Sequence, residues 1–202
     1  MTKSELRKEF LERRRGVSAG EVAEASRRIA ERFFANVELD GVRFLHTFIR
    51  IPKFNEIDTS AIYMRVWRDL PEITTVAPRV DHGTGGMDGI AFDEQTPLAE
   101  GRWGIREPAA GALIAPEKLD VVLVPMLIFD RAGHRVGYGK GFYDRFLKQV
   151  RPDCVKAGLC LWGPLDEPIE TSEMDVALDL FITPNEIYRP GHTIDASGGP
   201  PN

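Results

Sequence analysis

The sequence has few cysteines and histidines, the residues that cross-link small extracellular folds or bind metal ions. Its 202 residues include only two cysteines, Cys154 and Cys160, which are too few and too close together for a disulfide framework. Cys160 lies in the apolar run VKAGLCLW, where a buried, reduced thiol is expected. The four histidines are scattered without the pairing of a zinc site. The composition therefore favours an ordinary cytoplasmic enzyme or binding domain.

Long apolar runs and an excess of positive charge are also missing. No run approaches the ~20 apolar residues that span a bilayer, and the start MTKSELRKEF lacks the apolar core of a secretory signal. The formal net charge is −5, so the molecule as a whole does not attract nucleic acid or an anionic membrane. We expect neither as a partner, and any anionic ligand must be held by a local cluster of cations.

Helices and strands alternate along the chain. Capping-box patterns at Thr2 (T-x-x-E) and Ser18 (S-x-x-E) predict two N-terminal helices, the second over about 19–34. Further helices are expected over 58–70 and roughly 141–150, and the stretch 81–89 is expected to be a glycine-rich loop. Strands are predicted at 42–49, 73–78, around 89–92, 120–125, 155–162 and 179–183.

These elements predict one α/β domain over residues 1–188, followed by a flexible tail over 189–202. The run DVVLVP (120–125) is continuously apolar and ends at a proline, as is typical of a central parallel strand. We expect an open, mainly parallel sheet with helices on both faces and an N-terminal helical hairpin. Ligands bind such sheets at the carboxyl ends of the strands, so the loop after DVVLVP is the first candidate site.

That loop reads FDRAGHRVGYGKGFYDR (129–145). Its alternating glycines allow main-chain N–H groups to approach a ligand, and a helix starting near Gly141 would point its free N–H groups into the same space. The cations Arg135, Lys140 and Arg145 make the loop a candidate cradle for a polyphosphate. It is neither a P-loop nor a dinucleotide fingerprint. Asp144 is suited to hold magnesium, although a salt bridge to Arg145 and a solvated basic turn remain the structural alternatives.

The stretch VPMLIFDRAGHRVGYGKGFYDRFL (124–147) resembles the signature of the 5-formyltetrahydrofolate cyclo-ligase family, F-D-x-x-G-x-R-[LV]-G-x-G-x-G-[YF]-Y-D. Other segments are similar to family segments in order and spacing: KSELR, RIPKFNEIDTSAI (50–62), RWGIREP (102–108) and EMDVALDLFIT (173–183). The resemblance extends to about Pro184. It implies a NagB/RpiA/CoA-transferase-like sheet and the MgATP-dependent closure of 5-formyltetrahydrofolate to 5,10-methenyltetrahydrofolate, with release of ADP and phosphate. We expect the protein to be a monomer.

In that reaction the formyl oxygen attacks the γ-phosphate of ATP, and N10 of the folate then displaces phosphate from the resulting iminophosphate. The resemblance implies that Lys3 and Arg7 reach the ATP phosphates and that Arg135 and Lys140 act on the transferred group. The remaining ATP contacts fall on the loop and the start of the next helix: Gly137, Tyr138, Gly139, Gly141, Phe142, Tyr143, Asp144 and Arg145. Without the resemblance, Lys3 and Arg7 would be two solvated charges on an amphipathic helix.

For the folate, the resemblance implies that Glu56 contacts the formyl or pterin end, with Met87, Trp103 and Tyr143 around the ring systems and Arg79 near the glutamate tail. Asp144 would bind magnesium with Asp179 as second carboxylate, and Asp175 competes for that second place. Two positions depart from the family pattern, because Phe142 stands where tyrosine is common and Met174 where histidine is common.

Three rival functions stay open from the sequence. A sugar-phosphate isomerase or acyl-transfer enzyme would share the sheet architecture, but the cation-rich loop with Asp144 suits a metal-bound triphosphate better than a monophosphate. A non-catalytic folate- or nucleotide-binding relative would keep much the same residues. A role on RNA is opposed by the acidic net charge.

Overall fold

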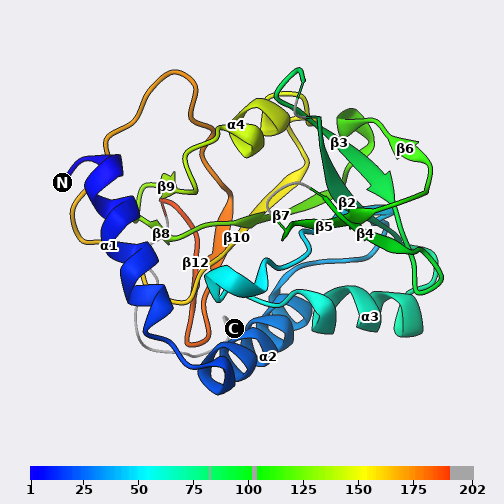
Figure 1. The fold of residues 1–202 in the computed structure, drawn as a ribbon, viewed down its shortest axis with the longest axis horizontal. Helices are drawn as coiled ribbons and strands as arrows, with labels where there is room; N and C mark the ends of the chain where they lie inside the picture. Colours follow the sequence, from blue (N-terminus) through cyan, green and yellow to red (C-terminus); the bar gives the residue numbers. More distant parts are fainter. Residues whose placement is uncertain (82, 102–103, 192–202) are drawn as a thin grey trace, which may run out of the picture.

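The computed structural model describes residues 1–81, 83–101 and 104–191, and its centre is an eight-stranded sheet in the order β12-β11-β10-β7-β1-β2-β3-β6 (Figure 1). The strands from β11 to β2 pair in parallel, and antiparallel pairs follow at both ends. The sheet strands are β1 (Phe44–His46), β2 (Thr74–Asp81), β3 (Gly86–Ala91), β6 (Leu113–Ile114), β7 (Val121–Pro125), β10 (Val155–Leu159), β11 (Leu180–Ile182) and β12 (Ile187–Tyr188).

In the described part of the chain, two small hairpins and six helical segments complete the fold. The hairpins are β4–β5 (Leu98–Glu100 and Arg106–Pro108) and β8–β9 (Ile128–Phe129 and Arg135–Val136). The helices are α1 (Lys3–Arg15), α2 (Ala19–Asn36), α3 (Ser60–Asp69) and α4 (Phe142–Leu147), with 3-10 turns η1 (Pro52–Phe54) and η3 (Pro116–Lys118). Among the described residues, no helix has the length and apolarity needed to cross a membrane.

The predicted α/β architecture is confirmed, and β7 shows why the sheet needs helices on both faces. Val121 and Leu123 belong to the core beneath α2 and α3, whereas Val122 and Val124 belong to the core beneath α1 and α4. Successive side chains of a strand point to opposite faces, so a strand that is buried on both sides must be apolar throughout. Figure 1 shows α2 and α3 on one side of the sheet and α4 on the other.

The N-terminal helices begin where the capping boxes place them, because Thr2 and Ser18 each accept the N–H of the glutamate three residues on. They are joined by a short turn and then diverge. Helix α1 lies against β9 and η1, whereas α2 packs on α3 and β11. The two helices therefore serve opposite faces of the sheet.

Two local predictions were wrong in their extent. The helix expected over 141–150 is limited to the six residues of α4, so it is too short to bring a strong helix dipole to the loop. The stretch 81–89 is not a loop throughout, because β2 continues to Asp81 and β3 starts at Gly86. Asp81 closes the turn by accepting the N–H of Gly83 at 2.8 Å and the hydroxyl of Thr84 at 2.7 Å.

The strand order creates one switch point. From β1 the chain first moves outward to β2 and later returns to the other side of β1 as β7. The segments that follow β1 and β7 therefore leave the sheet side by side at its carboxyl edge. Open α/β sheets bind ligands in the crevice formed at such a point, and the loop that carries the signature lies there.

Candidate active site

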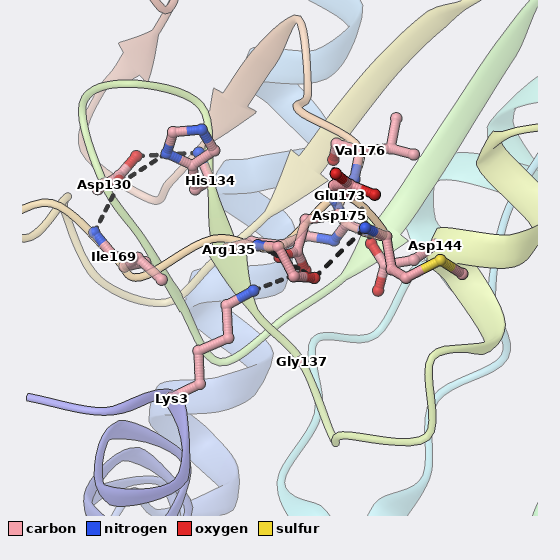
Figure 2. A network of polar contacts seen from close by, with 12 residues as sticks. Lys3, Asp130, His134, Arg135, Gly137, Asp144, Ile169, Glu173, Asp175 and Val176 are labelled. Carbon is pink, nitrogen blue, oxygen red and sulfur yellow. Dashed lines mark hydrogen bonds and ion pairs between the residues drawn. The ribbon is translucent and has the colours of Figure 1, made fainter.

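The first half of the signature loop is the hairpin β8–β9, and Asp130 shapes its turn. One carboxylate oxygen of Asp130 accepts the N–H groups of Ala132 at 3.0 Å and His134 at 2.9 Å, and the other accepts that of Ile169 at 2.8 Å (Figure 2). Burial by itself would raise the pKa of Asp130, but the hydrogen bonds from the Ile169 and His134 N–H groups and the His134 ring lower it. The aspartate is a structural residue that fixes the hairpin and, with it, the position of Arg135.

Arg135 is buried and joins the hairpin to two other segments. Its guanidinium lies 2.6 Å from Oδ1 of Asp144 and also donates to the carbonyl oxygen of Val176. The N–H of Val176 donates to the same Asp144 oxygen at 3.4 Å. Burial lowers the pKa of Arg135, while Asp144 and Asp175 raise it, and an arginine stays protonated at neutral pH. A fixed guanidinium, paired with Asp144, therefore lies in β9, directly before the glycine loop.

Helix α1 attaches its own cations to the same edge. Lys3 pairs with Asp175 at 2.6 Å, and Nε of Arg7 donates to the carbonyl oxygen of Gly137 at 2.9 Å (Figure 2 shows the Lys3 contact). The Arg7 guanidinium lies so close to Gly139 that a Cβ there would approach it to 2.8 Å, and Gly139 has a φ of +82°. A side chain at this position would therefore clash with Arg7 and strain the backbone.

Glu56 lies in a buried network beneath the loop. Glu56 is only 4 % exposed. One oxygen of its carboxylate accepts a hydrogen bond from the Tyr138 hydroxyl at 2.8 Å, and the other accepts one from the Ile51 N–H at 2.8 Å. The Tyr138 hydroxyl in turn accepts a hydrogen bond from Nη1 of Arg14 at 2.8 Å. Arg14 is 1 % exposed and also donates to the carbonyl oxygen of Met126, directly after β7. Segments from both sides of the switch point thus meet at Glu56.

A second polar pair, the buried His46 and the partly buried Tyr143, lies at the end of β1. His46 is fully buried, and neither ring nitrogen has a hydrogen-bond partner among the described residues; the same holds for the hydroxyl of Tyr143. The two rings meet edge to face with centroids 6.0 Å apart, and His46 also contacts Phe146 at 4.9 Å. Burial lowers the pKa of His46 to about 3, so the imidazole is neutral. Burial and the Glu56 charge both raise the pKa of Tyr143.

Most of the residues predicted for the nucleotide gather at this edge, either in the loop or against it. Lys140 is exposed at its tip. Arg145 turns away from the loop's interior and donates to the carbonyl oxygen of Gly85 at 2.7 Å and to that of Lys140 at 3.2 Å. Phe142 lies beneath the Arg145 guanidinium, 5.3 Å from it. The Arg135 contact shows that Asp144 forms its salt bridge across the loop instead of with its neighbour Arg145.

Other predicted residues lie elsewhere. Asp179 precedes β11 and pairs with Lys156 at 3.0 Å, at the amino edge of the parallel strands, so the structure does not bring it to Asp144. Asp175, which pairs with Lys3, is instead a carboxylate close enough to Arg135 to raise the pKa of that arginine. Met87 packs from β3 against the core below the loop, and Arg79 faces Asp88 at 3.8 Å across the β2–β3 ladder. Trp103 lies outside the described residues.

Arg14 and His46 were not predicted from the sequence to belong to the site. Arg14 stands in the run RRR (13–15), where it resembles a solvated charge, yet it lies seven residues after Arg7 and four after Phe10. That spacing puts it on the buried face of α1, so the signal was present. His46 is the last residue of the short strand β1, and nothing in the sequence around it indicated a functional role.

Fold and site together define a doubly wound α/β ligand-binding protein whose switch point carries a cationic glycine loop above a buried carboxylate. Over residues 1–184 the chain matches the sequence model of the 5-formyltetrahydrofolate cyclo-ligase family, and it belongs to that family. It is 25% identical over 182 residues to the cyclo-ligase of Escherichia coli K12, covering 88% of this chain and 98% of that protein.

Two further comparisons agree. The mitochondrial cyclo-ligase of Arabidopsis thaliana is 28% identical over 166 residues, which cover 71% of this chain and 60% of that protein, so the chain spans less than two thirds of that relative. The solved structure of a 5,10-methenyltetrahydrofolate synthetase from Aquifex aeolicus superposes with a TM-score of 0.74 at 27% identity, covering 98% of this chain and 97% of that chain.

Proposed function

We propose that this protein closes the ring of 5-formyltetrahydrofolate with MgATP, releasing 5,10-methenyltetrahydrofolate, ADP and phosphate. One observation carries the proposal: the glycine loop (137–141) contacts the cation-bearing helix α1 through Arg7 and the buried carboxylate Glu56 through Tyr138. A single short segment therefore adjoins both the place for a triphosphate and the place for a second substrate. A phosphoryl transfer between two substrates requires this kind of shared position.

The phosphate half of the proposal rests on charge and on backbone geometry. Arg7 and Arg135 are held by hydrogen bonds on either side of the loop, and Lys140 is exposed at its tip. Donors and cations fixed before the reaction stabilise the charge of a transferred phosphoryl group without reorganising. In this proposal the Lys3–Asp175 pair is shared with, or opened by, the incoming phosphates.

Magnesium enters this proposal together with ATP. In the described part of the chain no group of three or more Asp, Glu, His or Cys residues is arranged to hold a metal. Mg²⁺ is commonly held by one or two carboxylates with substrate phosphates and water. Asp144 fits that role because its two side-chain contacts both use Oδ1, and its side chain is 26% exposed. Asp175 is the neighbouring carboxylate; when bound, the ion would neutralise phosphate charge.

The folate half of the proposal rests on Glu56. A buried carboxylate with an oriented hydrogen-bond donor on each oxygen still has free lone pairs for a substrate N–H group. It lies below the loop, where the formyl group must meet the γ-phosphate for the formyl oxygen to attack. Tyr143, near Glu56 and His46, offers a ring face and a hydroxyl without a partner in the described structure. A monomeric state and a cytoplasmic location remain predictions.

The test mixes purified protein with 5-formyltetrahydrofolate and MgATP and follows methenyltetrahydrofolate absorbance and ADP release together. We expect the two products to grow in equal amounts and to vanish when ATP, magnesium or the folate is left out. Folded protein that binds ATP but forms no methenyl product would contradict the proposal and favour a non-catalytic binding protein. ADP release without methenyl product would point to a different acceptor on the same fold.

A further inference from the structure

We propose that Arg14 and Tyr138 are positioning residues for Glu56, and that they hold its carboxylate in the one orientation that meets the reacting end of the folate. This inference rests on the proposed function, which gives Glu56 its role. Tyr138 thereby belongs to both halves of the site, because its backbone lies in the phosphate loop and its hydroxyl binds the carboxylate on the folate side.

The contacts leave Glu56 little freedom. Tyr138 and Ile51 each donate to a different carboxylate oxygen at 2.8 Å, so the plane of the carboxylate is fixed by two donors from separate segments. Arg14 restrains the Tyr138 hydroxyl at 2.8 Å and is itself anchored on the carbonyl oxygen of Met126. The Tyr138 proton must therefore point to Glu56, because Arg14 has only donors to offer it.

The backbone next to Glu56 is tied to the same helix. Asn55 has a φ of +47°, the one positive value of a non-glycine residue in the described chain. Its side-chain amide donates to the carbonyl oxygens of Arg14 at 3.1 Å and Val17 at 2.9 Å, at the end of α1. A left-handed residue that is not glycine persists where its surroundings hold it. Helix α1 thus sets both the chain path and the side-chain orientation of Glu56.

The network also controls the charge of Glu56. Burial raises the pKa of this carboxyl, while the Ile51 N–H, the Tyr138 hydroxyl and the Arg14 charge lower it. Tyr143 is the other titratable group close enough to be affected by the Glu56 charge, and Arg135 lies beyond it. A purely structural network would not need a charge, since an apolar replacement of similar volume is often at least as stable. Removing the Tyr138 hydroxyl or the Arg14 charge should therefore raise the pKa of Glu56 further.

The test uses Tyr138→Phe and Arg14→Met, with Arg13→Met as the matched control. Phenylalanine keeps the ring that packs on Phe54, with centroids 5.5 Å apart, and removes only the hydroxyl. Arg13 is the exposed neighbour of Arg14 on the same helix and lies over Trp162, 4.8 Å from the ring. Each variant is measured for kcat and KM of both substrates as a function of pH.

For Tyr138→Phe and Arg14→Met we expect the KM for 5-formyltetrahydrofolate to rise about 10-fold, with the KM for ATP nearly unchanged because the loop backbone is intact. The acidic limb of kcat/KM should move to higher pH, since activity needs ionised Glu56 and its pKa has risen. Arg14→Lys should restore part of the shift, and Arg13→Met should follow the wild type. Superimposable pH profiles and unchanged folate KM values in the folded variants would overturn the inference.

A measurement without turnover separates this inference from the proposed function. Carbon-13 labelled glutamate allows the Glu56 carboxyl to be titrated by NMR, its signal being assigned by its loss in Glu56→Gln. We expect a higher pKa in Tyr138→Phe than in the wild type, and an equal pKa would overturn the inference even if the enzyme is active. An inactive wild type with the expected NMR shift would contradict the proposed function alone. Should Arg14→Met fail to fold, Tyr138→Phe carries the test.

Discussion

The two edges of the parallel sheet carry similar residues in different arrangements. At the amino edge, Asp120 accepts the N–H groups of Arg43 and Phe44 at 2.8 Å each and pairs with Arg151. Asp179 likewise accepts the N–H of Lys156 at 2.7 Å. At the carboxyl edge, the carboxylates meet side chains of loops and of helix α1: Asp144 meets Arg135, Asp175 meets Lys3 and Glu56 meets Tyr138.

The difference separates structural carboxylates from those available for chemistry. Each amino-edge aspartate completes the hydrogen bonding of a neighbouring strand, so its oxygens serve the sheet. Each carboxyl-edge acid lies between loops and helices that a ligand can displace or join. Residue type and motif order do not distinguish the two cases. The position of a residue relative to the direction of its strand does, and Asp179 stands directly before β11.

Of the substitutions that test this difference between the edges, Lys140→Ala should have the largest effect on activity. Lys140→Ala should lower kcat/KM by about 10²-fold or more, because a cation beside the transferred phosphoryl group is lost. The unfolding midpoint should stay at the wild-type value, since the residue is exposed. Steady-state kinetics with MgATP and thermal unfolding measure the two quantities.

The control is Lys118→Ala, which removes an exposed lysine of η3 just before β7, at the amino edge. Its kinetics should match those of the wild type. A folded Lys140→Ala enzyme that runs at the parent rate would show that the loop does not hold the transferred phosphate.

Local signals explain what could be predicted from the sequence. The helix starts at Thr2 and Ser18 follow from capping boxes, and the central strand β7 follows from its continuous apolar run. The cationic glycine loop follows from its own residues. The Arg14–Tyr138–Glu56 network joins residues up to 124 positions apart, and only the packing of α1 on the loop brings them together. The turn β8–β9 was missed because its strands are two residues each.

The next largest expected effect is that of His46 on the pH dependence of stability. His46 is a buried polar residue at the carboxyl edge, and its ring nitrogens have no hydrogen-bond partner in the described structure. Its pKa is lowered from 6.5 to about 3 in the folded protein, so the unfolded chain binds the extra proton between these values. The free energy of unfolding should therefore decrease as pH falls below 6.5, with this histidine contributing about 1.4 kcal/mol per pH unit until about 3.

His46→Phe should remove that contribution, since phenylalanine packs beside Phe146 and does not titrate. The measurement is urea unfolding of both proteins at a series of pH values, and the difference between the two curves isolates one residue. The wild type should lose stability relative to the variant as pH falls, and above pH 6.5 the difference should be constant. A difference that stays constant through the acidic range would mean that His46 is protonated in the fold or reaches solvent there.

The smallest expected effect is at Asp179, and it tests the comparison most directly. Asp179→Ala removes the acceptor of the Lys156 N–H and leaves the nearly buried Lys156 ammonium with the carbonyl oxygen of Cys154 at 2.8 Å. We expect a loss of about 1–3 kcal/mol in the free energy of unfolding. Asp179→Asn keeps an acceptor for the backbone, so it should lose less.

Activity decides whether Asp179 belongs to the sheet or to the metal. If the residue is structural, both variants should keep the wild-type kcat and the wild-type dependence on magnesium concentration at a temperature where they are folded. Asp144→Asn should instead raise the magnesium concentration needed for half-maximal rate, because Asp144 lies under the glycine loop beside Arg135. If Asp179→Asn needed more magnesium for half-maximal rate while its stability was unchanged, Asp179 at the amino edge would be the metal carboxylate and its structural role would be wrong. That outcome would require β11 to shift its register on β10, since the present pairing of Leu180 with Ala157 keeps Asp179 at Lys156.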